Sequence, residues 1–425
     1  MRTPRLSSRR LSVLLAVLAT MVVAASPAAA GPKQSSGLTP IVLFPAWHFT
    51  RLEVTVKNQR VDPACPSSGT FEDLVFFDPG PPFSQVCRDE LLTLRYKADN
   101  PRMPMRLRFS EQPGVTVRIA DYGLTASAPA YEPMYQALEA AGYTRNQDIR
   151  VAGYDARLTP DMAGFLQRSK HLIEATYRDN GRRPVHLVGH SNGPIYIQYL
   201  LTHTSQAWKD KYIHGFTPLA GNFPGQGLGY ALMFVGVNIS DLTFPVTSAN
   251  GVSSARMFLS HPSTFITASD PDIFGNDEVV IRDQSTGVAY TPEDYHALFN
   301  DAALPWVNPI ADFYIGGVPF ADSAHFPNVD VYAEKGSGLE TLVGLGLADL
   351  SVGQLVTGTT EFITRDGDIN QEDITNDAVA VWAAMACHHF SLTDNPGVNH
   401  FELPGNPAVL ARLIANANSP RSDCN

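Results

Sequence analysis

Cysteine, basic residues and long apolar runs are all scarce in this chain of 425 residues. Four cysteines occur, without the close Cys-x-x-Cys pairs that bind zinc. The apolar stretch from Leu11 to Ala25 is shorter than the roughly 20 residues that span a bilayer. Lys and Arg number 31 against 42 Asp and Glu, so the formal net charge is −11. These shortages argue against a cysteine-based zinc site, a retained membrane anchor and a nucleic-acid-binding protein.

The first 30 residues predict a secretory signal peptide. Four arginines precede the apolar run, and Ala28-Ala-Ala30 provides small residues for cleavage after Ala30. The pair Arg9-Arg10 also leaves twin-arginine export open, although the residues after it fit that signal poorly. Without this leader, 27 basic and 42 acidic residues remain, a formal charge of −15. We expect a secreted, acidic protein whose lipid contacts, if any, depend on apolar surface.

The cysteines of an exported chain predict two disulfides. Of the three possible connectivities, we favour pairing between sequence neighbours. Cys65 and Cys87 would close a loop rich in Pro, Gly and Asp, and Cys387 and Cys424 would tie down the C-terminal end.

One apolar segment ends in a motif typical of nucleophilic serines. Residues 185–193 read Val-His-Leu-Val-Gly-His-Ser-Asn-Gly, a strand-like run that closes with Gly-x-Ser-x-Gly. The two glycines allow a strand and a helix to approach closely while Ser191 adopts a strained backbone conformation. A plain turn would use the same residue types, but the strand before the motif and the helical spacing after it favour a catalytic elbow.

Strand and helix patterns alternate around this motif. Strands are expected near 38–45, 115–120, 148–151 and 329–333, and helices near 131–141, 161–179, 194–201 and 407–415. A serine at the carboxyl end of a strand within such alternation predicts an α/β fold with a mostly parallel central sheet flanked by helices.

The alternation fades after about residue 224, which indicates an insertion. We interpret residues 226–328 as a cap between two parts of the core, 31–225 and 329–425, with a polar, cysteine-bearing lid excursion at about 62–90. The apolar run 228–237 is too short to span a bilayer. Core packing explains it best, and a lipid-facing lid is the alternative.

Serine needs an imidazole to take its proton and a carboxylate to orient that imidazole, in the chain order Ser, acid, His. Asp368 lies in a glycine-containing loop after a strand and is the first choice for the acid, with Asp366 as the alternative. His400 precedes the last helix and is favoured as the base over His388 and His389, which flank a cysteine.

The acidic loop also resembles a calcium loop, because Asp366, Asp368 and Asn370 occupy alternate positions. However, Gln371 stands where an EF-hand needs glycine, and Asp377 replaces the bidentate Glu. We therefore predict no metal. A tetrahedral oxyanion would be held by the backbone N–H of Asn192 and by a second N–H after the first strand, for which Trp47 is the candidate.

Three segments resemble the lecithin:cholesterol acyltransferase and lysosomal phospholipase A family in order and spacing. They are 141–145 (Ala-Gly-Tyr-Thr-Arg) with 154–158 (Tyr-Asp-Ala-Arg-Leu), then 189–193, then 206–210 (Gln-Ala-Trp-Lys-Asp) with Gly215-Phe216. The resemblance covers most of the chain after the leader and is best from about 110 to 225. It implies an α/β-hydrolase fold in which Ser191, Asp368 and His400 form the triad and Trp47 and Asn192 donate to the oxyanion. It also implies that the loop between Cys65 and Cys87 forms a small disulfide-closed lid region near the lipid entrance.

The chain departs from the family's pattern at three places. Ala46 follows Pro45 where the family usually has glycine, Ala156 replaces a tryptophan, and Asn370-Gln371 replaces Thr-Val after the acid. The cap does not align convincingly, so substrate choice cannot be transferred.

The sequence therefore predicts a secreted serine enzyme that cleaves an acyl ester of a lipid, a phospholipid first, at a membrane or lipid-particle surface. Water or an alcohol would accept the acyl group, and no cofactor or nucleic acid is expected to take part. No protein partner can be inferred. A general secreted serine esterase or lipase acting on other esters and a non-catalytic lipid-binding relative are the alternatives.

Overall fold

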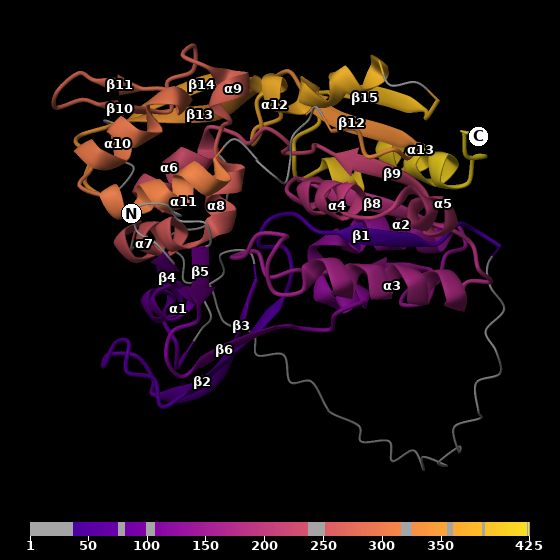
Figure 1. Cartoon of the computed structure of the whole chain (residues 1–425), viewed down its shortest axis with the longest axis horizontal. Coiled ribbons are helices and arrows are strands. Elements are labelled where there is room, and N and C mark those ends of the chain that lie inside the picture. The colour runs from indigo at the N-terminus through magenta and orange to yellow at the C-terminus, as the bar shows by residue number, and fades with distance from the viewer. Residues whose placement is uncertain are drawn as a thin grey trace, which may run out of the picture. The chain divides into compact units, whose positions relative to one another are not determined.

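A parallel sheet forms the centre of the fold (Figure 1). The structure, a computed structural model, describes residues 37–74, 81–98, 107–236, 251–315, 325–354, 360–384, 387–422 and 424. Within these residues the strand order is β15 (Phe390–Pro396), β12 (Val331–Ser337), β9 (Ile213–Leu219), β8 (Val185–His190), β1 (Ile41–Phe44) and β7 (Ile149–Val151). All neighbouring pairs are parallel. The predicted fold class is confirmed.

Both faces of this sheet are covered, and for this reason its central strands β1, β8 and β9 are buried along their whole length. In β1, Ile41 and Leu43 pack on one face, against α2 (Glu132–Ala140) and α13 (Pro407–Ala417). Val42 and Phe44 face the other way, toward α3 (Phe165–Asp179) and α4 (Gly193–Thr202), with α5 (Gln206–Tyr212) beside α3. The period-2 alternation of a strand therefore divides the core into two layers.

Two predicted elements differ from expectation. The strand near 115–120 is β6 (Val115–Ile119), which pairs antiparallel with β2 (Leu52–Lys57) rather than joining the parallel sheet. Its alternating burial suits a sheet with one exposed face. The helix expected from residue 161 begins only at Phe165, because Ala163 and Gly164 have φ values of 50° and 67°.

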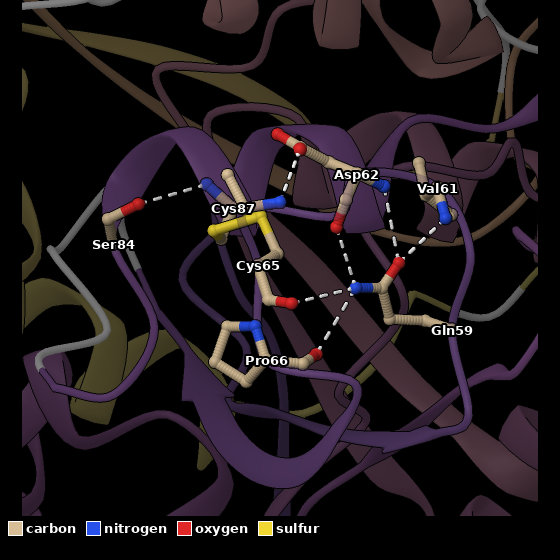
Figure 2. Close-up of a disulfide and its surroundings, with 8 residues drawn as sticks. Gln59, Val61, Asp62, Cys65, Pro66, Ser84 and Cys87 are labelled. Atoms are coloured by element: carbon tan, nitrogen blue, oxygen red, sulfur yellow. Dashed lines mark hydrogen bonds between the residues drawn. A yellow bond between two sulfur atoms is a disulfide. The ribbon is translucent and has the colours of Figure 1, made fainter.

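The lid excursion contains a short helix that is tied down by a disulfide (Figure 2). Strand β3 (Ser68–Asp73) pairs with β2, and α1 (Gln85–Leu92) follows. Ser84 caps α1 by accepting a hydrogen bond from the N–H of Cys87, which bonds to Cys65. A small hairpin follows, β4 (Arg95–Ala98) with β5 (Leu107–Ser110).

The amide of Gln59 shapes the loop before Cys65. Its amide nitrogen, Nε2, donates hydrogen bonds to the carbonyl oxygens of Asp62, Cys65 and Pro66. Its Oε1 accepts hydrogen bonds from the N–H groups of Val61 and Asp62 (Figure 2). One buried side chain thus satisfies several backbone groups of an irregular loop.

The described part of the predicted cap contains short helices and contributes two strands to a second sheet. The helices are α6 (Leu228–Val235), α7 (Gly251–Ser260), α8 (Pro262–Thr267), α9 (Pro271–Phe274), α10 (Tyr295–Asp301) and α11 (Asn308–Tyr314). The sheet has the order β11 (Ala289–Tyr290), β10 (Ile281–Asp283), β13 (Leu339–Leu347), β14 (Glu361–Gly367). Strands β13 and β14 follow residue 328, so this sheet combines strands from both sides of the predicted cap boundary.

The apolar run in the cap is largely internal. All eight residues of α6 are buried, and the helix packs against α7 and α8. Residue 237, the last of the predicted run, lies outside the described residues, as do residues 1–30, the predicted signal peptide. None of the helices in the described ranges has the length and apolar character needed to cross a membrane.

Candidate active site

Ser191 occupies the sharp turn between β8 and α4. Its φ is 60°, a strained value for a residue with a side chain. Its N–H donates to the carbonyl of Leu219 (2.9 Å), and its own carbonyl accepts from the N–H of Asn222 (3.0 Å). A Cβ on Gly193 would lie 2.2 Å from the carbonyl oxygen of Phe44, and one on Gly189 would lie 2.7 Å from the nitrogen of Pro194. The two motif glycines therefore permit the close packing that the strained serine requires.

His400 and Asp368 form a buried pair. The ring Nδ1 of His400 lies 3.0 Å from Oδ2 of Asp368, and the N–H of His400 donates to the carbonyl of Asp368 at 2.9 Å. The second carboxylate oxygen accepts from the N–H groups of Asn370 (3.1 Å) and Gln371 (2.7 Å). Because a carboxylate only accepts, Nδ1 carries the proton and Nε2 keeps its lone pair. This is the tautomer that a general base needs.

The alternative acid, Asp366, lies elsewhere. It is exposed on β14, where it pairs in register with Glu340. Gly367 ends the strand, and its position admits no Cβ, because one would lie 2.2 Å from the carbonyl oxygen of Gln371. The tight turn there directs the next residue, Asp368, toward His400. The structure thus brings Asp368 and not Asp366 to the histidine.

Two carboxylates of the calcium-like segment form an ion pair or hydrogen bonds within the protein. Asp377 pairs with Lys335 at 2.6 Å, and both oxygens of Asp368 are used as described above. In the part of the chain that the structure covers, no group of three or more His, Cys, Asp or Glu side chains is arranged to hold a metal ion.

Ser191 and His400 face one small cavity of about 20 Å³. Its wall includes Trp47, Asn192 and Asn370, together with apolar side chains of α6 and the rings of Phe49 and Phe401. Among the described residues, no hydrogen bond joins the Ser191 hydroxyl to the His400 ring. Such contacts often tighten only in the substrate complex.

The two predicted oxyanion donors lie beside the serine. The Asn192 side chain donates to the hydroxyl of Thr267 (2.7 Å) and accepts from Asn222 (2.7 Å). The indole N–H of Trp47 donates to the carbonyl of Ala156 (2.8 Å) and contacts Ser263 (3.1 Å). These side-chain bonds hold the backbone on both sides of the cavity in place. That the main-chain N–H groups bind the oxyanion stays a prediction.

A chain of hydrogen bonds, not anticipated from the sequence, joins three loops behind the site. The N–H of Ala46 donates to the Tyr131 hydroxyl (2.7 Å), and that hydroxyl donates to Nδ1 of His190 (2.9 Å). Nε2 of His190 in turn donates to the carbonyl of His400 (3.0 Å). Burial, and secondarily the nearby His400, lowers the pKa of His190 well below its ordinary value, so the ring is neutral. The signal was present in the motif, since His190 directly precedes Ser191.

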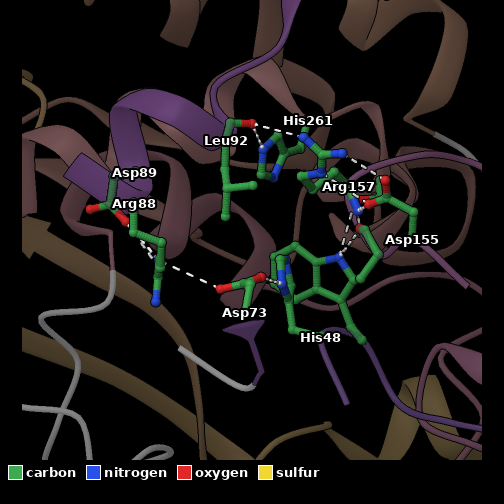
Figure 3. A network of polar contacts seen from close by, with 11 residues as sticks. His48, Asp73, Arg88, Asp89, Leu92, Asp155, Arg157 and His261 are labelled. Carbon is green, nitrogen blue, oxygen red and sulfur yellow. Dashed lines mark hydrogen bonds and ion pairs between the residues drawn. The ribbon is translucent and has the colours of Figure 1, made fainter. Parts of the chain in front are cut away.

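A buried polar network links the lid to the cap (Figure 3). Asp73, at the end of β3, lies 3.7 Å from Arg88 of α1 and 3.9 Å from His48, the neighbour of Trp47. Burial by itself would raise the pKa of Asp73, but the contacts with His48 and Arg88 hold it below its ordinary value. Through these two contacts, Asp73 connects α1, the helix that carries Cys87, to the loop that contains the predicted oxyanion donor Trp47.

Further hydrogen bonds attach α1 to the helices of the cap. Asp89 accepts from the hydroxyls of Ser253 (2.8 Å) and Ser254 (2.6 Å) on α7. The carbonyl of Leu92 accepts from His261 at 3.1 Å and from Arg157 at 3.4 Å (Figure 3). Because these groups are buried, the loss of any one of these bonds would not be replaced by a bond to bulk water, and it would weaken the attachment of α1 to the cap.

Two buried carboxyls, Glu278 and Glu372, lie next to the acid loop. Glu372 accepts from the N–H of Gly227 (3.1 Å), just before α6, and Glu278 accepts from Ser269 (3.1 Å). Burial raises the pKa of Glu278 to about 7. Burial and the charge of Glu278 raise the pKa of Glu372 well above its ordinary value. These two buried carboxyls thus connect the acid loop with the cap.

Both predicted disulfides are present. Cys65 bonds to Cys87, and Cys387 bonds to Cys424. His388 lies 3.4 Å from Asp330, and the ring of His389 packs against another aromatic ring, so neither histidine approaches the serine site. The disulfides fit an extracellular or lumenal location.

A serine on a strained turn after a parallel strand, with a later acid and a still later histidine, defines an α/β-hydrolase. The family model for lecithin:cholesterol acyltransferase matches residues 104–304. This match extends into the predicted cap, past the segment from about 110 to 225 in which the resemblance is best. Together with the relatives described next, this match shows that the chain is similar to the lecithin:cholesterol acyltransferase and lysosomal phospholipase A family.

Three curated relatives align with different shares of the chain. Lysosomal phospholipase A and acyltransferase of Mus musculus is 28% identical and covers 71% of this chain and 72% of its own. Phosphatidylcholine-sterol acyltransferase of Gallus gallus is 30% identical over 55% of this chain and 57% of its own. Lecithin-cholesterol acyltransferase-like 1 of Oryza sativa subsp. japonica is 25% identical over 86% of this chain and 83% of its own.

A solved structure shares the fold. The crystal structure of the Tle4-Tli4 complex contains a chain with a TM-score of 0.52 and 13% sequence identity, covering 90% of this chain and 99% of that one. At this identity the likeness concerns the fold alone.

Proposed function

We propose that this protein is a lipid acyl hydrolase and O-acyltransferase that works through an acyl-Ser191 intermediate. The observation that carries the proposal is the buried pair of His400 and Asp368, in which His400 faces the same cavity as Ser191. The names of the family's relatives, a phospholipase A and acyltransferase and two acyltransferases, support the lipid ester as substrate and transfer as part of the activity.

The geometry favours the following reaction. Nε2 of His400 takes the hydroxyl proton of Ser191 while Oγ bonds to the acyl carbon of the ester. The tetrahedral oxyanion lies against the N–H groups of Trp47 and Asn192. When the ester C–O bond breaks, His400 gives its proton to the leaving alcohol, and Asp368 stabilises the imidazolium in between. Water or a second alcohol then loses its proton to His400 as its oxygen bonds to the acyl carbon. When the bond between that carbon and Oγ of Ser191 breaks, His400 returns the proton to Oγ, and the free serine is restored.

The surroundings of Ser191 suit a lipid ester. Leu228 and Leu232 of the buried helix α6 line the cavity next to the serine, and aromatic rings line its other side. A phospholipid is the proposed acyl donor, and the two disulfides support action outside the cell or in a lumen. Secretion through the leader at 1–30 remains part of this proposal.

The test uses the purified protein and phospholipid vesicles with a labelled acyl chain, with and without a long-chain alcohol. We expect labelled fatty acid without the alcohol and a labelled ester with it. Ser191→Ala should lower both products by about three orders of magnitude or more, and a fluorophosphonate should no longer label the protein. Ser67→Ala, an exposed serine in the lid, is the matched control and should behave as wild type.

Other outcomes would contradict the proposal in distinct ways. Turnover of short soluble esters without turnover of vesicles would indicate a general esterase. Neither product and no labelling of Ser191 would indicate a non-catalytic lipid-binding relative.

A further inference from the structure

A second, larger cavity of about 430 Å³ lies beside the catalytic one. This volume falls in the range of small-molecule binding pockets, roughly 300 to 1,000 Å³. The catalytic cavity, at about 20 Å³, has room for little more than one water molecule. A long alcohol that accepts the acyl group therefore needs space outside the catalytic cavity.

Two phenylalanines belong to the walls of both cavities. The rings of Phe49 and Phe401 stack with their centroids 6.3 Å apart and their planes at 13°. Phe401 is 36% exposed and Phe49 is partly buried, so neither ring is locked in a close-packed core. Rotation of these side chains would join the two spaces without any movement of the backbone.

The larger cavity lies on the side of the base. Its wall contains His190, whose ring donates to the carbonyl of His400, and Phe401, which follows His400 in the chain. In acyl transfer the histidine handles the proton of the alcohol oxygen, so the alcohol must lie next to Nε2 of His400. The alcohol part of the reaction, rather than the acyl chain, therefore belongs on this side.

The chemistry of the wall indicates a neutral, apolar ligand. Most of the wall is made of Pro, Met, Ala and aromatic side chains, and among the residues lining the cavity Glu402 is the one charged group. No lysine or arginine in this lining could hold a phosphate. The polar atoms of Tyr131 and His190 already bond to each other and to neighbouring backbone groups. The Tyr131 hydroxyl and the His190 ring thus have their hydrogen-bond partners within the protein, and they require no polar group from a ligand.

We propose that this cavity binds the hydrocarbon part of a neutral long-chain alcohol that accepts the acyl group from Ser191. The inference rests on the proposed acyltransferase function and adds the site at which the acceptor binds. Phe49 and Phe401 form the passage between the acceptor cavity and the acyl-enzyme.

Filling the cavity from its rim tests this assignment. Ala130 lines the cavity but is itself exposed, on a 3-10 helix at Pro129–Tyr131, so Ala130→Trp places an indole in the space without replacing a core residue. With labelled phospholipid and decanol, the ratio of new ester to fatty acid should fall at least fivefold. With ethanol, which needs no apolar pocket, the ratio should stay near the wild-type value. The measured quantities are the two products and the KM for each alcohol.

Ala126→Trp is the matched control, because Ala126 is an exposed alanine on the preceding 3-10 helix and does not line the cavity. It should leave both ratios unchanged. Equal ratios for decanol in Ala130→Trp and wild type, with fatty acid still released, would overturn the acceptor site and leave the proposed function standing. Absence of both products in the wild type would overturn the proposed function itself.

Discussion

At the scale of single residues, two aspartates only two positions apart have different environments. Asp368 is fully buried against His400, whereas Asp366 is exposed on β14. Replacing the buried carboxylate by an amide would keep its shape but remove the charge that stabilises the imidazolium, and it would allow the wrong tautomer of His400. Asp368→Asn should therefore lower kcat by about four orders of magnitude.

Steady-state release of labelled fatty acid measures this loss, and a thermal unfolding curve shows whether the variant is folded. Asp366→Asn is the control and should stay within about twofold of wild type, as surface substitutions usually have small effects. If Asp366→Asn were inactive and Asp368→Asn active, the acid would be assigned to the wrong residue.

At the scale of elements, the buried carboxyls of Glu278 and Glu372 connect the acid loop to the start of α6. Both have a folded-state pKa above the ordinary 4.5, for Glu278 about 7, mainly because of burial. The folded protein therefore holds more protons than the unfolded chain above pH 4.5. This contribution to stability is fully present below pH 4.5 and is lost as the pH rises through about 7.

Glu372→Gln should reduce the loss of folding stability that wild type shows as the pH rises. Its amide oxygen can still accept from Gly227, and it carries no charge to repel Glu278 or Asp368. Arg365, 3.7 Å from Glu278, is the nearby cation that offsets part of the repulsion in wild type. The fall in Tm between about pH 5 and pH 8 should be smaller in the variant. Scanning calorimetry measures it, with Glu340→Gln, an exposed carboxyl on β13, as the control whose slope should match wild type. An unchanged slope in Glu372→Gln would contradict the assignment.

At the scale of the whole molecule, the negative net charge should weaken binding of the protein to anionic lipid surfaces. The chain after residue 30 carries a formal charge of −15. Vesicles of zwitterionic phospholipid should therefore bind more protein than vesicles that also contain an anionic lipid, and the difference should shrink between low salt and about 0.15 M. Cosedimentation of the Ser191→Ala variant measures binding without turnover. Tighter binding to the anionic vesicles would instead reveal a local basic surface.

Much of the fold could be predicted because its signals are local. The Gly-x-Ser-x-Gly turn depends on two glycines that allow backbone contact, as the positions of Gly189 and Gly193 confirm. The central strands are rich in apolar residues because both faces of a parallel sheet are covered. Both disulfides were predicted from cysteine spacing in an exported chain and are present.

Other features depend on partners far away in the chain. The pattern of Val115–Ile119 predicts a strand but not which sheet it joins, and β6 pairs with β2 instead of the central sheet. Strands β13 and β14 pair with the cap strand β10, across the boundary expected at residue 328. The polar chain of Tyr131, His190 and His400 likewise needs three loops to meet.

The sequence alone predicts the turn at Ser191 and the class of the fold, because both depend on backbone sterics or periodicity within a few residues. The order of the expected triad follows from the Gly-x-Ser-x-Gly motif. The sequence already ranked Asp368 ahead of Asp366, and the tertiary structure places Asp368 at His400. Only the tertiary structure shows a second cavity beside the base and the contacts that link the lid to the cap. Those outcomes depend on contacts between distant residues, such as His190 with His400 at a separation of 210, and local propensity carries no information about which distant groups will meet.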